Sequence, residues 1–104
     1  MTAFVTSLRS RPETIVLGKG MTIRVEMAEV WDAVRIETPI TEPISEIKAA
    51  ALKALYPDDH SDADFVVKLN GYEILDESVP VSQTGAIDGS TLLVTFRRRR
   101  PVRS

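Results

Sequence analysis

The sequence of 104 residues contains no cysteine, one histidine and six aromatic residues. Without cysteine there is no disulfide, no thiol nucleophile and no thiolate metal site. No stretch approaches the roughly 20 apolar residues of a transmembrane helix, and the short apolar start lacks the preceding basic segment of a signal peptide. We therefore expect a small cytoplasmic protein, with one domain and a single, mainly aliphatic core.

The net charge of −2 hides an uneven distribution of charge. Residues 21–96 contain 14 acidic and five basic groups, whereas residues 97–104 contain five arginines and no acidic group. An acidic body with a basic end favours one of two interpretations. Either the tail lies over the body and keeps the chain soluble, or it contacts an anionic partner.

Alternating apolar and polar residues predict strands over 21–27 and 33–37, joined as an antiparallel hairpin. A third strand is predicted over 65–70, a short fourth over 72–75 and a last one over 91–96. Asn70-Gly71 favours the left-handed backbone of a tight turn between the third and fourth strands. A single helical turn is possible in the connection 77–90.

One helix is predicted over residues 43–56. Pro43 suits its first turn, and Ile44, Ile47, Ala51 and Leu55 form an apolar stripe at helical spacing. Lys48 is expected on the solvent side. The polar residues, Pro12 and two glycines of 1–20 predict a flexible N-terminal arm, in which only residues 13–17 pair weakly with a sheet edge.

In this order the elements resemble ubiquitin and other ubiquitin-like β-grasp proteins. The segments that carry the similarity are Met21–Val25, Pro43–Lys48, Val67–Glu77 and Ser90–Arg97. The resemblance implies an α+β fold, a mixed four- to five-stranded sheet with one helix packed across it. Its first and last strands pair in parallel at the centre. The domain would cover residues 21–97 and be followed by a basic tail, 98–104.

The resemblance also implies that this chain lacks the C-terminal residues that conjugation requires. Conjugated members of the family end in two glycines, whose carboxylate is adenylated and passed to a thiol. Here Arg100 and Pro101 stand at the matching positions, and the sequence contains no Gly-Gly dipeptide. Arginine is bulky and proline fixes its own backbone torsion, so we expect neither conjugation nor sulfur transfer.

Catalysis is not expected either. His60 lies in a loop with Asp58, Asp59, Asp62 and Asp64, but the spacing lacks the glycine and the distal glutamate of a calcium loop. Serines and carboxylates occur without a paired base, which excludes a recognisable nucleophilic triad. We interpret 58–64 as a solvated loop and expect no metal and no cofactor.

The remaining function is binding of a protein partner by a monomer. Ubiquitin's main recognition surface lies on the sheet face away from the helix, at positions that match Ala28, Lys68, Leu93 and Thr95. We expect Val66 and Leu93 to face outward. With Trp31 they could form a small apolar contact surface; the alternative is that the N-terminal arm or a hairpin neighbour covers Trp31, or that all three are ordinary surface residues. The predicted partner-binding residues are Trp31, Val66, Lys68, Leu93, Thr95, Arg97, Arg98, Arg99 and Arg100.

Other functions stay open. The arginine tail could contact nucleic acid or an anionic membrane, although no interleaved aromatic residues follow it to stack on bases. The turn Gly85–Leu92 is weakly similar to small ubiquitin-like proteins of bacterial type VII secretion. A protein modifier or sulfur carrier with a divergent C-terminus is a third alternative.

Overall fold

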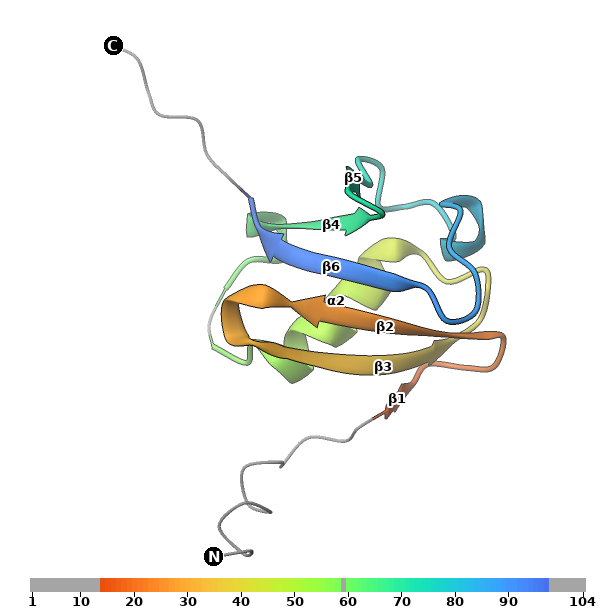
Figure 1. Ribbon diagram of the computed structural model, residues 1–104, viewed down its shortest axis with the longest axis horizontal. Helices are drawn as coiled ribbons and strands as arrows, with labels where there is room; N and C mark the ends of the chain where they lie inside the picture. Colours follow the sequence, from red (N-terminus) through yellow and green to blue (C-terminus); the bar gives the residue numbers. More distant parts are fainter. Residues whose placement is uncertain (1–13, 59, 98–104) are drawn as a thin grey trace, which may run out of the picture.

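A mixed six-stranded sheet carries one α-helix across one of its faces (Figure 1). The structure is a computed structural model that describes residues 14–58 and 60–97. The strand order across the sheet is β1-β3-β2-β6-β4-β5. The elements are β1 (Thr14–Val16), β2 (Met21–Met27), η1 (Ala28–Val30), β3 (Asp32–Thr38), α2 (Ile44–Leu55), η2 (Asp62–Asp64), β4 (Phe65–Leu69), β5 (Tyr72–Glu73), η3 (Val81–Gln83) and β6 (Thr91–Phe96).

The centre of the sheet is a parallel pair formed by β2 and β6. Val25 lies opposite Leu92 in this pair, while β3 flanks β2 and β4 flanks β6 in antiparallel pairing. Parallel strands need a crossover connection, and the chain between β2 and β6 provides one, since it passes through α2 on one face of the sheet (Figure 1). This is the arrangement that the sequence predicted.

The sheet has six strands where four or five were expected. The expected edge pairing of residues 13–17 is present as β1, which runs parallel to β3, and the N–H of Leu17 donates to the carbonyl oxygen of Glu37 at 2.8 Å. The predicted fourth strand is shorter than expected, since β5 contains only Tyr72 and Glu73. Strands of two or three residues are too short to show alternation. Residues 1–13 of the predicted arm lie outside the described part of the chain.

The core lies between α2 and the facing side of the sheet. The predicted hairpin turn is present, because Asn70 and Gly71 both have positive φ, 53° and 86°. Every residue predicted to face inward is buried, namely Ile23, Val25, Val34, Ile36, Ile44, Ile47, Val67, Leu69, Leu92 and Val94. Phe65, Leu52 and Val81 complete this core.

Lys48 corrects the sequence analysis, which placed it in solvent. Its side chain is only 3% exposed, and its Nζ donates to the carbonyl oxygen of Phe65 at 2.8 Å and to the carboxylate of Glu77 at 2.9 and 3.1 Å. The helix starts at Ile44, so Lys48 lies one turn later on the same face. The predicted stripe was too narrow to include it.

This ion pair joins three parts of the chain. Lys48 belongs to α2, Phe65 opens β4, and Glu77 lies in the connection after β5. The carbonyl oxygen of Glu77 also accepts the N–H of Ser45 in the first turn of α2, at 2.8 Å. The helix is therefore fixed by polar contacts as well as by its apolar face.

Amide hydrogen exchange should be slowest in the two central strands. We expect the strongest protection at residues 23–25 of β2 and 92–94 of β6, because both strands are paired on two sides and buried on the helix-facing side. The short edge strands β1 and β5 should exchange faster. Exchange measured by NMR tests this order, and rapid exchange in β6 would contradict the central parallel pair.

Replacing Lys48 should destabilise the domain. Lys48→Ala leaves the Glu77 carboxylate and the Phe65 carbonyl without their donor, so we expect the free energy of unfolding to fall by about 3 kcal/mol. Lys48→Met keeps most of the apolar stem and should also destabilise. Lys53→Ala, an exposed lysine of the same helix, is the control and should stay within about 0.5 kcal/mol. Equal effects of Lys48→Ala and Lys53→Ala in urea unfolding would contradict the role of the ion pair.

Candidate interaction surface

The sheet face away from α2 brings together several of the predicted partner-binding residues. Lys68 lies opposite Leu93, and Val66 lies opposite Thr95, in the pairing of β4 with β6. Leu93 also lies opposite Glu26 of β2. Its half-buried side chain is therefore flanked by a carboxylate and an ammonium group, and this face is mainly polar around one leucine.

Val66 is a second correction, because it is only 5% exposed. Arg97 follows β6, yet its Nε donates to the carbonyl oxygen of Ala63 at 3.0 Å and its Nη1 lies 3.8 Å from a carboxylate oxygen of Glu73 on β5. The side chain of Arg97 thus joins the segment before β4 to the edge strand β5. Val66 is not available as an exposed apolar anchor.

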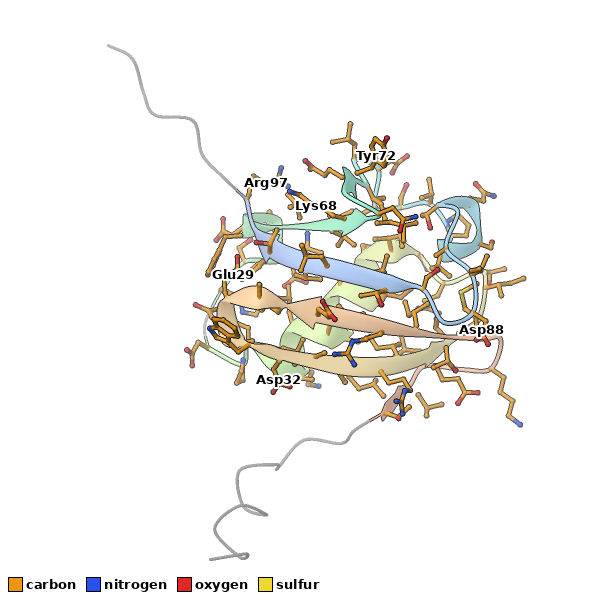
Figure 2. All side chains as sticks on the ribbon, in the orientation of Figure 1. Glu29, Asp32, Lys68, Tyr72, Asp88 and Arg97 are labelled. Atoms are coloured by element: carbon orange, nitrogen blue, oxygen red, sulfur yellow. The ribbon has the colours of Figure 1, made fainter. Side chains whose placement is uncertain are left out.

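A hydrogen-bonded clamp joins the first hairpin to the last strand. The carboxylate of Glu29, in η1, accepts the hydroxyl of Thr95 and the N–H of Phe96, the latter at 3.1 Å. Figure 2 shows Glu29 and Arg97 at one end of the sheet and Asp88 at the other. Partial burial raises the pKa of Glu29, but the hydrogen bonds from Thr95, from Phe96 and from its own N–H outweigh burial and lower the pKa overall.

Trp31 follows this clamp directly and is 94% exposed. Its backbone is left-handed, with φ of 55°, and its N–H donates to the carbonyl oxygen of Ala28 at 3.1 Å. A left-handed conformation favours glycine or asparagine and costs a bulky residue about 1–2 kcal/mol. Neither packing nor backbone preference therefore accounts for a tryptophan here.

The acidic loop expected around His60 is only partly solvated. The imidazole ring packs edge-on against Tyr56 and Phe65, with centroids 5.5 and 5.4 Å apart, and its Nε2 lies 3.1 Å from a carboxylate oxygen of Asp62. In residues 14–58 and 60–97, no group of three or more histidines and carboxylates could hold a metal ion. Within the same residues, no helix has the length and apolarity to cross a membrane.

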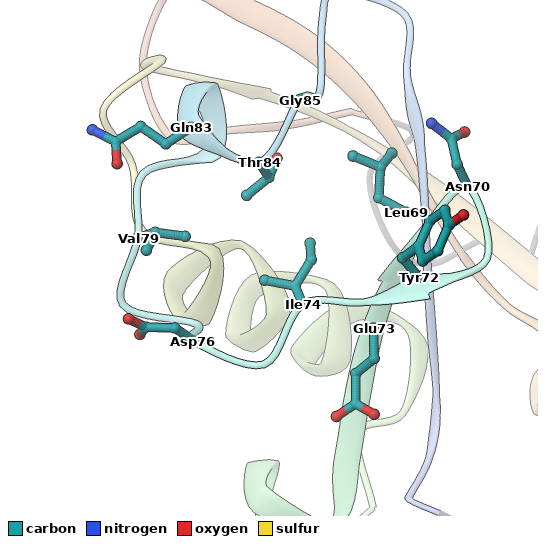
Figure 3. Close-up of a pocket in the computed structure, with 10 residues that line it drawn as sticks. All are labelled: Leu69, Asn70, Tyr72, Glu73, Ile74, Asp76, Val79, Gln83, Thr84 and Gly85. Carbon is teal, nitrogen blue, oxygen red and sulfur yellow. The ribbon is translucent and has the colours of Figure 1, made fainter.

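A groove of about 470 Å³ opens at the other end of β4, between β5 and η3 (Figure 3). Leu69, Ile74 and Val79 point into it. Tyr72, which is 79% exposed, and Glu73 stand beside these residues. No pattern in the sequence indicates this groove, because its lining comes from three separate segments with no shared periodicity.

No protein-family model and no curated protein sequence matches this chain, but solved structures do. The ubiquitin of Caldiarchaeum subterraneum matches with a TM-score of 0.63 and 11% sequence identity, over 76% of this chain and 95% of that protein. The ubiquitin-like domain of an Arabidopsis thaliana protein matches with a TM-score of 0.61 and 15% identity, over 85% and 88%. This chain has the ubiquitin-like β-grasp fold.

The ubiquitin-like fold confirms the fold class predicted from the sequence. Identities of 11% and 15% establish the fold alone, so the partner-binding residues stay predictions. In this ubiquitin-like domain the structure groups Lys68, Leu93, Thr95 and Arg97 on one face, and Trp31 lies in the hairpin between β2 and β3. Arg98, Arg99 and Arg100 lie outside the described residues. Sequence reasoning missed the Glu29 clamp, since it joins residues 66 positions apart.

The clamp makes stability depend on pH. Glu29→Gln should lower the free energy of unfolding by about 1 kcal/mol at neutral pH, because a charged acceptor at a partly exposed site is lost. The pKa of Glu29 is lower in the folded chain than its ordinary value of 4.5. The stabilisation is therefore present above that value and is lost as the pH falls through the folded pKa.

Urea unfolding of wild type and Glu29→Gln across a pH series measures this effect. The difference in stability between the two should be largest near neutral pH and should vanish in acid. Thr95→Val removes one donor of the clamp, so its effect should not add to that of Glu29→Gln. A difference that stays constant with pH would show that Glu29 stabilises the fold without its charge.

Proposed function

We propose that this ubiquitin-like domain is a non-catalytic module that binds a protein partner, with Trp31 at the centre of the contact. The observation that carries the proposal is that Trp31 is 94% exposed and holds a backbone conformation that disfavours it. Tryptophan is among the residues most enriched at energetic hot spots of interfaces. Backbone strain that folding does not require is also typical of functional positions.

The surroundings of Trp31 support this function. The Glu29 clamp fixes η1 against β6, so the tryptophan is presented on a preorganised hairpin and loses little freedom on binding. Thr95 belongs to the same clamp, while Leu93 and Lys68 lie further along the same face. A large apolar anchor with a polar surround is the usual composition of a transient protein interface.

In this role the chain is not conjugated to other proteins. Arg100 and Pro101 replace the two glycines of conjugated family members, and the ubiquitin-like fold itself is compatible with either role. With ATP and an adenylating enzyme, the chain should therefore form no terminal adenylate. Mass spectrometry that finds its C-terminus joined to a lysine in cells would contradict this part of the proposal.

Trp31→Gly separates binding from folding. Glycine accepts φ of 55° without strain, so the variant should be at least as stable as wild type in urea unfolding. It should nevertheless weaken binding of the partner at least about tenfold, as expected for loss of a tryptophan hot spot. The measurement is affinity capture from cells that contain the tagged chain, followed by titration of the protein that wild type retains.

Tyr72→Ala is the matched control, since Tyr72 is also an exposed aromatic residue but lies at the groove. It should leave capture of the same protein unchanged. Trp31 fluorescence in the isolated chain should resemble that of tryptophan in water. The opposite result would contradict the proposal. If Trp31→Gly still captures the partner and Tyr72→Ala does not, the partner binds at the groove.

A further inference from the structure

The groove between β5 and η3 combines apolar surface with carboxylates, and it plays no part in the proposed contact through Trp31. Leu69, Ile74 and Val79 supply apolar surface, while the carboxylates of Glu73 and Asp76 lie at the rim and point away from the hollow (Figure 3). The hydroxyl and N–H of Ser78 donate to Asp76 and lower its pKa, so this carboxylate is ionised at neutral pH. None of the described lining residues is a lysine, arginine or histidine. The groove suits an extended ligand that is both basic and apolar.

The C-terminal sequence has this composition. Residues 97–104 read Arg-Arg-Arg-Arg-Pro-Val-Arg-Ser, with five arginines, no acidic residue and the apolar pair Pro101-Val102. Arg97 already lies with its Nη1 3.8 Å from the carboxylate of Glu73. The arginine that directly precedes the tail therefore contacts a residue that lines the groove.

The tail is also long enough to reach the groove within one molecule. Arg97 donates its N–H to the carbonyl oxygen of Asp64, and Ile74 donates its N–H to that of Val67, so the groove residue Ile74 is about three strand residues, or about 10 Å, from the level of Arg97. Val102 is five residues beyond Arg97, and five extended residues span at most about 16–18 Å, which leaves about two residues for reversing the direction of the chain. A tail that turns back along β4 brings Pro101-Val102 to Ile74 and its arginines past Glu73.

We infer that residues 98–104 bind in the groove of their own molecule. The arginines pair with the carboxylates at its rim, and Pro101-Val102 cover Ile74. In this state the tail and the groove are both closed to other ligands until one of them is displaced. The inference concerns a different surface from the Trp31 contact, so either can fail without the other.

The absence of cysteine allows a direct test in the full chain. Ser104→Cys takes a single nitroxide label, which broadens the NMR signals of nearby amides. Because a short tether provides an effective concentration in the millimolar range, we expect at least about a twofold loss of intensity at Tyr72, Ile74 and Gly85. High salt should restore these signals, since ion pairs at the surface are screened.

Two variants of the labelled chain test the charge contact. Glu73→Gln removes the carboxylate nearest to Arg97 and should reduce the broadening at the groove. Glu46→Gln removes an exposed carboxylate of α2 and should leave it unchanged. Folding of each variant is verified by its own NMR spectrum.

Three results would overturn the inference. Broadening confined to Glu29, Trp31 and Phe96, at the end where β6 leaves the sheet, would mean that the tail stays out of the groove. A second test mixes two samples: chain that carries the nitroxide but no ¹⁵N, and chain that carries ¹⁵N but no nitroxide. Broadening of the ¹⁵N signals in this mixture would mean that the tail binds a second molecule. Broadening that Glu73→Gln leaves intact would mean that charge does not hold the tail.

Discussion

The parallel pairing of β2 with β6 is the constraint on which the rest of the structure depends. Two strands from the beginning and the end of the described chain meet at the centre of the sheet, and parallel strands cannot be joined by a tight turn. The chain must therefore cross one face, and α2 makes this crossing while covering the apolar side of the sheet. Every other strand adds outward from this pair.

Periodicity predicted the fold because the long elements are regular. Seven-residue β2, with its strict alternation, and the apolar stripe of α2 fix which faces are buried. The exceptions have physical causes. A lysine counts as polar in any hydrophobic periodicity. The aliphatic stem of Lys48 nevertheless packs on the buried face, while its ammonium group reaches Phe65 and Glu77. Its partners lie 17 and 29 residues away, where no local pattern connects them.

The candidate surface was predicted less completely than the fold. Strand alternation identified the face of Leu93, Thr95 and Lys68, and it also placed Val66 there. Alternation cannot show which neighbouring side chains cover a residue, so it could not show that Val66 is buried. The exposure of Trp31 was one of two alternatives that the sequence left open, whereas its left-handed backbone and the Glu29 clamp follow from tertiary contacts alone. The groove has no sequence signature at all.

The position of β6 has a mechanical consequence. Because the last described strand lies in the interior of the sheet and runs parallel to β2, a force that pulls the C-terminal tail away from the N-terminal end of β2 acts along both strands. Their hydrogen bonds then bear the load together, in shear, rather than opening one after another as at a peeled edge. A tail anchored at the centre of the sheet is thus suited to transmit tension through the domain without unravelling it.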